Sequence, residues 1–216
     1  KGSINCEGEI ITKFLNNSTV FAKGAVKVEK EIMNCQVISG AVDAPQSQIA
    51  GGEIIAVKNI DIKEAGSQMG VRTVLHAGRN YFLEQDVKHL QEELDLSKKR
   101  VLELESSMKI AQPLMAKLSE VKRQGVTKIM DRTGQLKARV AKLEAEIEEK
   151  KKQVHSNDAA ITIRAAVHPG VCIRIGRYEK TLTKQFDGYR RFEFDKNKYD
   201  IVAYFSEEEG KKDAKK

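Results

Sequence analysis

The sequence predicts a mixed, mainly β fold: a parallel β-helix interrupted by a long antiparallel coiled-coil hairpin and followed by a small antiparallel β segment. Three observations carry this prediction. Glycines and alternating aliphatic residues recur before residue 80, heptad-spaced aliphatic residues fill 81–155, and the glycine-aliphatic pattern returns after residue 156. We therefore expect β-helix coils in 1–80, the hairpin in 81–155, a resumed coil with capping strands in 156–205 and a disordered charged tail in 206–216.

The first region is read from its internal repeat. Gly8, Gly24 and Gly40 are separated by 16 residues, and the same offset aligns Ile4 with Val20. Alternation of apolar and polar residues around each glycine sends every second side chain to one face, as a strand requires. A repeat this short favours successive coils of a parallel β-helix that bury a continuous core by stacking. The next interval, from Gly40 to Gly52, is 12 residues, which predicts one shorter coil.

The second region carries two heptad series. The first runs through Leu83, Val87, Leu90, Leu94, Val101, Leu104, Met108, Ala111, Met115 and Leu118, and the second through Val126, Ile129, Thr133, Leu136, Val140, Leu143, Ile147, Lys150 and Val154. Two such series in one chain bury their stripes most readily as an antiparallel coiled-coil hairpin. Pro113 and Gly125 are the helix breakers. They predict a first arm over 84–112, a short helix over 113–124, a tip near 113–126 and a return arm over 126–155.

The third region resumes the coil at 160–163 and 168–176 and ends in an antiparallel set over 177–183, 188–194 and 200–205. Asp187-Gly188 supplies a turn signal within that set. The set is rich in Tyr and Phe, and we expect it to cap the stack of coils, because an exposed edge invites pairing with other chains.

Composition excludes several functional classes. The net charge of +7 is spread as +1, +3 and +3 over 1–80, 81–155 and 156–216, so no region has the concentrated basic patch typical of nucleic-acid binding. Cys6, Cys35 and Cys172 lack CxxC spacing and are odd in number, which predicts free buried thiols in a reducing cytosol rather than disulfides or zinc ligands. No apolar run reaches the ~20 residues of a membrane span.

Residues capable of catalysis or metal binding are sparse. His76 and His155 bracket the hairpin and are expected to lie near its base, either as a metal pair, as a pH-sensitive hinge or, as we favour, as polar side chains that satisfy backbone groups. His168 precedes Pro169 and is interpreted as a turn residue. The coil period differs from that of hexapeptide acyltransferases, and neither a phosphate-binding loop nor a nucleophile elbow is present. We predict no enzymatic activity, no cofactor and no metal.

The candidate protein-binding site is the hairpin tip. Its basic residues are Lys117, Lys122, Arg123, Lys128 and Arg132, and they are opposed only by Glu120 and Asp131. A cluster of cations at the end of a helical arm is suited to an acidic partner or an anionic surface. The competing interpretation is a charged helix end that is simply solvated.

The order of these parts resembles the bacterial flagellar assembly protein A family. The resemblance is carried by the 16-residue coils, by Gly66-Ser-Gln-Met-Gly70-Val71-Arg-Thr73-Val-Leu75, by the heptad hairpin and by the Pro-Gly-Val-x-Ile-x-Ile strand over 169–175. It implies a right-handed β-helix, a cytoplasmic bacterial location and a non-enzymatic role in flagellar assembly or cell-pole organisation. Family members usually carry a domain before the β-helix, so we expect this chain to be a fragment that lacks it.

Two functions remain open. The first is a scaffold that binds flagellar-assembly or cell-pole proteins, with the coiled-coil arm as a spacer or docking lever and recruitment to the pole through a partner. The alternative is a self-assembling β-helix that forms filaments or oligomers, either through its ends or through intermolecular pairing of the heptad arms. Neither function involves nucleic acid or direct insertion into a membrane.

Overall fold

The structure is a computed structural model that describes residues 2–113 and 119–205. It contains two compact units, Lys1–Phe82 with Val154–Lys216 and Leu83–Gln153. The expected disordered tail over 206–216 and the seam positions Met115 and Leu118 lie outside the described residues. Within the described residues, no helix is both long and apolar enough to cross a bilayer.

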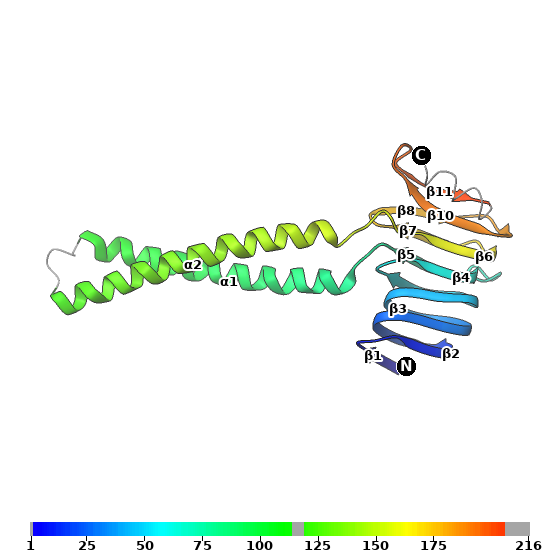
Figure 1. The fold of residues 1–216 in the computed structure, drawn as a ribbon, viewed down its shortest axis with the longest axis horizontal. Helices are drawn as coiled ribbons and strands as arrows, with labels where there is room; N and C mark the ends of the chain where they lie inside the picture. The colour runs from blue at the N-terminus through cyan, green and yellow to red at the C-terminus, as the bar shows by residue number, and fades with distance from the viewer. Residues whose placement is uncertain (1, 114–118, 206–216) are drawn as a thin grey trace. The chain divides into compact units, whose positions relative to one another are not determined.

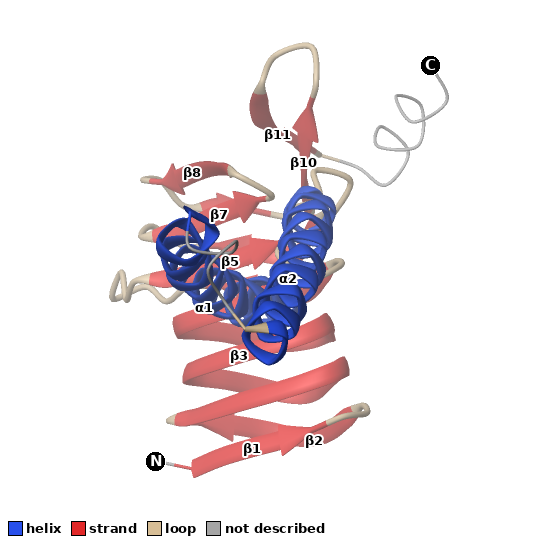
Figure 2. Ribbon diagram, turned by 90° about the vertical axis from the view of Figure 1, so that its left-hand side faces the viewer, coloured by secondary structure: helices blue, strands red, loops and turns tan. Residues whose placement is uncertain are grey.

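The first unit is built from parallel strands wound in coils (Figures 1 and 2). Before the helices these strands are β1 (Gly2–Cys6), β2 (Ile10–Asn16), β3 (Ser18–Ala56), β4 (Ile60–Ala65) and β5 (Thr73–Ala77), and after them come β6 (Ile161–Val167) and β7 (Val171–Ile175). Gly2 pairs with Ser18 and Ile10 with Val26, which reproduces the 16-residue offset of the sequence. The long β3 winds continuously through successive coils in Figure 2.

The coil stack continues across the helical insertion. β4 pairs in parallel with β6, with Ile60 opposite Ile161, and β5 pairs in parallel with β7, with Thr73 opposite Val171. Inward-facing aliphatic side chains form one core along the stack; its fully buried members include Val20, Ile54, Ile60, Leu75, Ile161 and Ile173. Because each coil buries its aliphatic residues against the next, the core is continuous on both sides of the insertion.

One edge of the coils is a column of glycines. A Cβ at Gly24 would lie 2.6 Å from the carbonyl oxygen of Gly8, and a Cβ at Gly40 would collide with the carbonyl oxygen of Lys23. In the next coil Lys58 occupies the position that corresponds to these glycines. Its backbone N–H donates to the carbonyl of Gly40 at 2.9 Å.

The predicted shorter coil between Gly40 and Gly52 is therefore wrong. Gly52 has φ 91° and stacks over Cys35 at a different corner. Val42 pairs with Ile60, so this coil is longer than the first ones. Gly40 only allows two backbones to approach closely, whereas Gly52 lies against the backbone of Cys35 and also takes up a left-handed turn.

The C-terminal strands pair antiparallel, but not as one set. These strands are β8 (Tyr178–Leu182), β9 (Phe186–Asp187), β10 (Arg190–Asp195) and β11 (Asp200–Tyr204). β8 pairs with β7, whereas β9 and β10 pair with β6 and β11 pairs with β10. Tyr178 and Phe194 stack with ring centroids 4.0 Å apart. The expected single set is replaced by strands that extend two different parts of the last coil, because each pairs with the nearest free strand edge.

The second unit contains two helices, α1 (Tyr81–Ala111), which begins in the first unit, and α2 (Glu120–Gln153). α1 ends just before Pro113, as expected from the missing N–H of proline. The predicted short helix over 113–124 and the helix stop at Gly125 are wrong, because α2 runs through Gly125. An interior glycine costs only about 1 kcal/mol relative to alanine. Packing along a helix of 34 residues outweighs that cost.

The two helices pack antiparallel along their apolar stripes. Leu94 on α1 and Leu143 and Ile147 on α2 are buried, with Val87, Leu90 and Val140 packed around them. Lys98 pairs with Glu144 at 2.7 Å and Glu105 with Lys137 at 2.6 Å, so the residue number rises on one helix as it falls on the other. At about 1.5 Å per residue, α1 is about 46 Å long.

The segments that lead into and out of the helices are hydrogen-bonded to each other. The N–H of Asn80 donates to the carbonyl of Val154 and the N–H of Ser156 donates to the carbonyl of Gly78, both at 2.8 Å. Arg79 and His155 form an antiparallel bridge between them. We call 78–80 and 154–156 the neck.

Candidate functional site

Four of the five predicted tip residues lie on α2, but not on one surface of it. Lys117 lies outside the described residues. Lys122, Arg123, Lys128 and Arg132 are all exposed. Lys128 and Arg132 are four residues apart and lie on one face of the helix, whereas Arg123 projects from a different side. The structure therefore brings Lys128 and Arg132 together and separates Arg123 from them.

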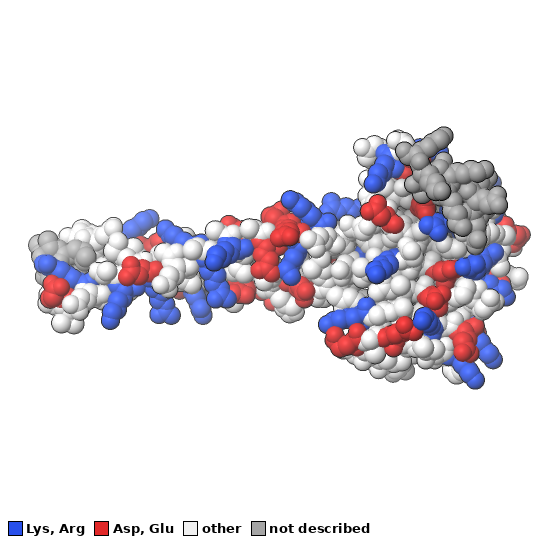
Figure 3. All heavy atoms as spheres, in the orientation of Figure 1, with Lys and Arg blue, Asp and Glu red and all other residues white. Residues whose placement is uncertain are grey.

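Three ion pairs join the two helices across the seam. Arg139 binds Glu93, and the pairs Lys98–Glu144 and Glu105–Lys137 lie on the opposite side of the seam. The pKa of Glu105 is lowered because its carboxylate accepts a hydrogen bond from Lys137. Figure 3 shows Lys and Arg interspersed with Asp and Glu along these helices.

Sequence reasoning missed one cation of this unit, Arg100. It is exposed on α1. Glu93 and Arg139 face each other across the seam. One heptad farther from the neck, the same antiparallel register places Arg100 opposite Arg132. The signal was available only after the pairing of the two helices was known, because neither series alone says which residues face each other.

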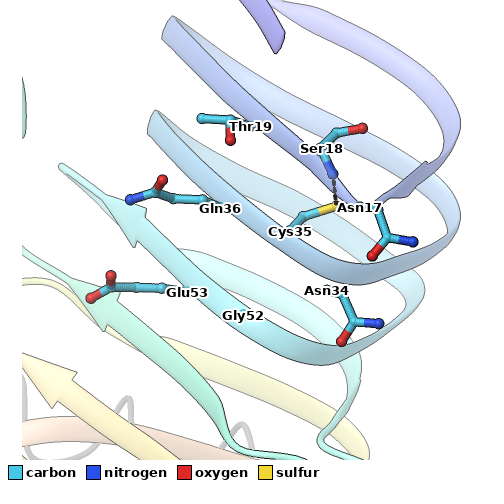
Figure 4. A pocket seen from close by; sticks show the side chains of 8 residues that line it. All are labelled: Asn17, Ser18, Thr19, Asn34, Cys35, Gln36, Gly52 and Glu53. Carbon is cyan, nitrogen blue, oxygen red and sulfur yellow. Dashed lines mark hydrogen bonds between the residues drawn. The ribbon is translucent and has the colours of Figure 1, made fainter. Parts of the chain in front are cut away.

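A shallow groove of about 340 Å³ crosses three coils of the first unit (Figure 4). Thr19, Gln36 and Glu53 project from successive coils on one side, and Asn17 and Asn34 lie at the bend. Both asparagines have positive φ, 47° and 50°, a conformation that asparagine tolerates better than most residues.

The floor of this groove includes the buried thiol of Cys35. Its sulfur accepts the N–H of Ser18 at 3.4 Å and donates to the carbonyl of Met33 at 3.2 Å. The contact with Ser18 joins the corners of two neighbouring coils, and the contact with Met33 lies within one coil. The polar wall formed by Thr19, Gln36 and Glu53 offers hydrogen bonds but holds neither a histidine nor a second carboxylate for acid–base chemistry.

His76 and His155 lie together at the neck, as their positions in the sequence suggested. Their rings are nearly parallel, with centroids 6.4 Å apart. Nε2 of His76 lies 3.0 Å from the carbonyl oxygen of Gly176, so the structural role that we favoured, satisfying a backbone group, is confirmed for His76. Burial, opposed by that hydrogen bond and aided by Arg79 and Arg174, lowers the pKa of His76 to about 4.

The remaining reactive groups are held in structural positions. His168 is buried just before the turn at Pro169-Gly170, and its backbone N–H donates to the backbone carbonyl of Ala65 at 2.8 Å. Burial and the neighbouring Glu179 raise the pKa of the Cys172 thiol. The described residues contain no group of three or more His, Cys, Asp or Glu side chains positioned for a metal ion.

Comparison with known proteins places these features in a family. A family model described as the Flagellar Assembly Protein A beta solenoid domain matches residues 1–199. No curated protein and no solved structure matches the chain. The matched region includes both units, since α1 and α2 fall inside it.

Proposed function

Since the chain belongs to the Flagellar Assembly Protein A beta solenoid family, we propose that it is a non-enzymatic scaffold that binds proteins during flagellar assembly. The coils, which we take as a right-handed solenoid, serve as the rigid base. The helical pair, which we take as a coiled coil, serves as a docking arm. We further propose that it works in the cytoplasm and reaches the cell pole through a partner.

One observation carries this proposal: some charges of the arm are paired across the two helices, whereas two of the predicted tip cations are not, within the part of the chain that the structure describes. Glu93, Glu105 and Glu144 each form an ion pair with the opposite helix. Among the described residues, neither Lys128 nor Arg132 has a carboxylate partner within 4 Å. Surface ion pairs contribute little stability, so this asymmetry bears on partner choice rather than on folding.

The chemistry of the first unit supports a binding role over catalysis. A thiol with a raised pKa, as at Cys172, is a poor nucleophile at neutral pH. A histidine whose pKa is lowered to about 4, as at His76, is a weak general base. The unit does offer a long, rigid body, because its aliphatic core and glycine column fix each coil against the next.

A second candidate, self-assembly through the coils, is favoured by one observation. Ile11 and Phe14 on β2 are 70% and 60% exposed, and β2 pairs only with β3 among the described strands. Exposed apolar side chains on a free strand edge promote association between chains. Sedimentation at increasing protein concentration tests it, since open-ended growth raises the mass without limit, whereas a scaffold keeps a fixed mass.

The scaffold proposal is tested by removing the arm while keeping the neck. Residues 84–152 are replaced by a short Gly-Ser link, and both forms are used to capture flagellar-assembly proteins from bacterial lysate. Circular dichroism checks that the β signal survives. We expect capture by the intact chain and loss of capture without the arm. Equal capture by both forms would show that the coils, and not the arm, bind the partner.

A further inference from the structure

One side of the helical pair combines unpaired cations with exposed aliphatic residues. On α1 this side follows a four-three spacing, and the same spacing continues on α2. Its members are Leu96, Arg100, Glu103, Ser107 and Ile110 on α1 and Val121, Gly125, Lys128 and Arg132 on α2. We call these nine residues the arginine face.

The charges on the arginine face are mismatched. The ion pair of Glu93 with Arg139 fixes the register on this side of the seam. One heptad farther from the neck, the same register brings Arg100 opposite Arg132, so two like charges face each other. Neither guanidinium has a carboxylate within 4 Å among the described residues, and Glu103 is the sole acidic member of the face. Opposed cations are an unfavourable arrangement that an anionic partner would relieve.

The other side of the seam differs in this respect. Two opposite-charge pairs, Lys98–Glu144 and Glu105–Lys137, span it at 2.7 and 2.6 Å. Both levels of charge are therefore neutralised on that side, whereas on the side of the arginine face Glu93 and Arg139 are paired and, in the described part of the helices, Arg100 and Arg132 are not.

The apolar members of the arginine face are unusually exposed. Leu96, Ile110 and Val121 expose 63%, 72% and 80% of their surface. Gly125 lies among them, and a Cβ built on it would meet nothing within 4 Å. A glycine in open space on a helix surface allows the backbone of another helix to approach closely.

We propose that the arginine face binds an acidic amphipathic helix of a partner protein, which packs its apolar stripe on Leu96, Ile110 and Val121. Its carboxylates would then pair with Arg100, Lys128 and Arg132. A second copy of this chain is disfavoured, because three cations and one carboxylate give the face a charge of +2 and two such faces repel. A membrane is disfavoured because the face has no aromatic residue and presents a glycine at its centre. This inference rests on the proposed role of the arm.

The test uses the intact chain and a defined probe. The probe is a labelled synthetic peptide of about four heptads with Leu at a and d and Glu at e and g, and its twin has Lys in place of Glu. Binding is measured by fluorescence anisotropy at low and high salt. We expect the acidic peptide to bind with an affinity that falls as salt rises, and the basic twin not to bind.

Two pairs of variants locate the site. Arg100→Gln with Arg132→Gln should weaken binding at least tenfold, whereas the control Lys99→Gln with Lys109→Gln removes the same charge elsewhere on α1 and should leave it unchanged. Gly125→Gln fills the open space and should weaken binding about tenfold. The matched control Gly134→Gln lies on the opposite side of α2, also in open space, and should not affect it. Both glycine replacements favour helix, so circular dichroism should show no loss of helicity.

The other outcomes overturn the inference. Absence of binding by the acidic peptide, or equal effects of each variant and its control, would show that the arginine face is not the site. Binding to phosphatidylserine vesicles without binding to the peptide would assign the face to a membrane. Association of the chain with itself, lost in Arg100→Gln, would assign it to a second copy. If removal of the arm abolishes capture of flagellar-assembly proteins while these variants capture normally, the scaffold role stands and only this face is excluded.

Discussion

Protonation of His76 should destabilise the first unit at mildly acidic pH. An unfolded histidine titrates near pH 6.5, whereas burial holds the pKa of His76 at about 4 in the folded chain. Between these values the unfolded state binds a proton that the folded state does not. The free energy of unfolding is therefore highest above pH 6.5 and falls as the pH falls towards 4.

The size of this effect follows from the two pKa values. Between pH 7.5 and 4.5 the linkage amounts to about 2.5 kcal/mol for this side chain. The proper comparison is His76→Gln, because a neutral amide can still donate to the carbonyl of Gly176 while losing the titration. Other carboxylates and histidines titrate in both proteins, so the difference between the two pH dependences isolates His76.

Tyrosine fluorescence during urea unfolding provides the assay. All five tyrosines lie in the first unit, and the chain has no tryptophan. Unfolding curves at pH 7.5, 6.5, 5.5 and 4.5 should show the wild type losing about 2.5 kcal/mol more than His76→Gln over this range. Parallel pH dependences in the two proteins would refute the reasoning, because they would show that burial does not hold His76 neutral.

Three further perturbations test the packing. Gly40→Ala places a Cβ against the carbonyl of Lys23 and should lower the free energy of unfolding, measured by the tyrosine signal in urea, by more than about 0.5 kcal/mol, the usual effect of a surface change. Leu143→Ala should destabilise the helical pair by about 2 to 4 kcal/mol in a far-ultraviolet circular-dichroism melt. The control Leu102→Ala changes a side chain that is 65% exposed and should destabilise the pair by less than about 1 kcal/mol. Equal losses of stability would contradict the packing of the seam. A thiol reagent should modify half-buried Cys6 faster than Cys172 in the native chain, and equal rates would contradict the burial of Cys172.

The sequence predicts the coils well where a recurring residue type has a single structural role. Gly24 and Gly40 recur at 16-residue intervals after Gly8 because a side chain at either position would meet the backbone of the preceding coil, and this produces a regular period. Gly52 breaks the period because glycine also serves left-handed turns, and a sequence does not distinguish the two uses. The same ambiguity explains why Gly125 was predicted to end a helix that runs through it.

The candidate site was predicted only in part for a different reason. Lys128 and Arg132 belong to one helix face, and their proximity follows from their spacing alone. Arg100 belongs to the other helix, and its position opposite Arg132 depends on the register between α1 and α2. That register is fixed by contacts such as Glu93 with Arg139, which a single heptad series does not contain.

The neck also bears on how the chain folds. Ile60 must find Ile161 across 101 positions of sequence to join β4 to β6, and pairing at such separation is slow because the loop must close first. The helical pair forms from contacts that are closer in sequence, and the hydrogen bonds of Asn80 to Val154 and Ser156 to Gly78 then hold its two ends together. With 83–153 folded, the open loop shrinks to about 30 residues, which reduces the entropic cost of closure by about 1 kcal/mol. The insertion that interrupts the coils in sequence thus shortens the search by which they are completed.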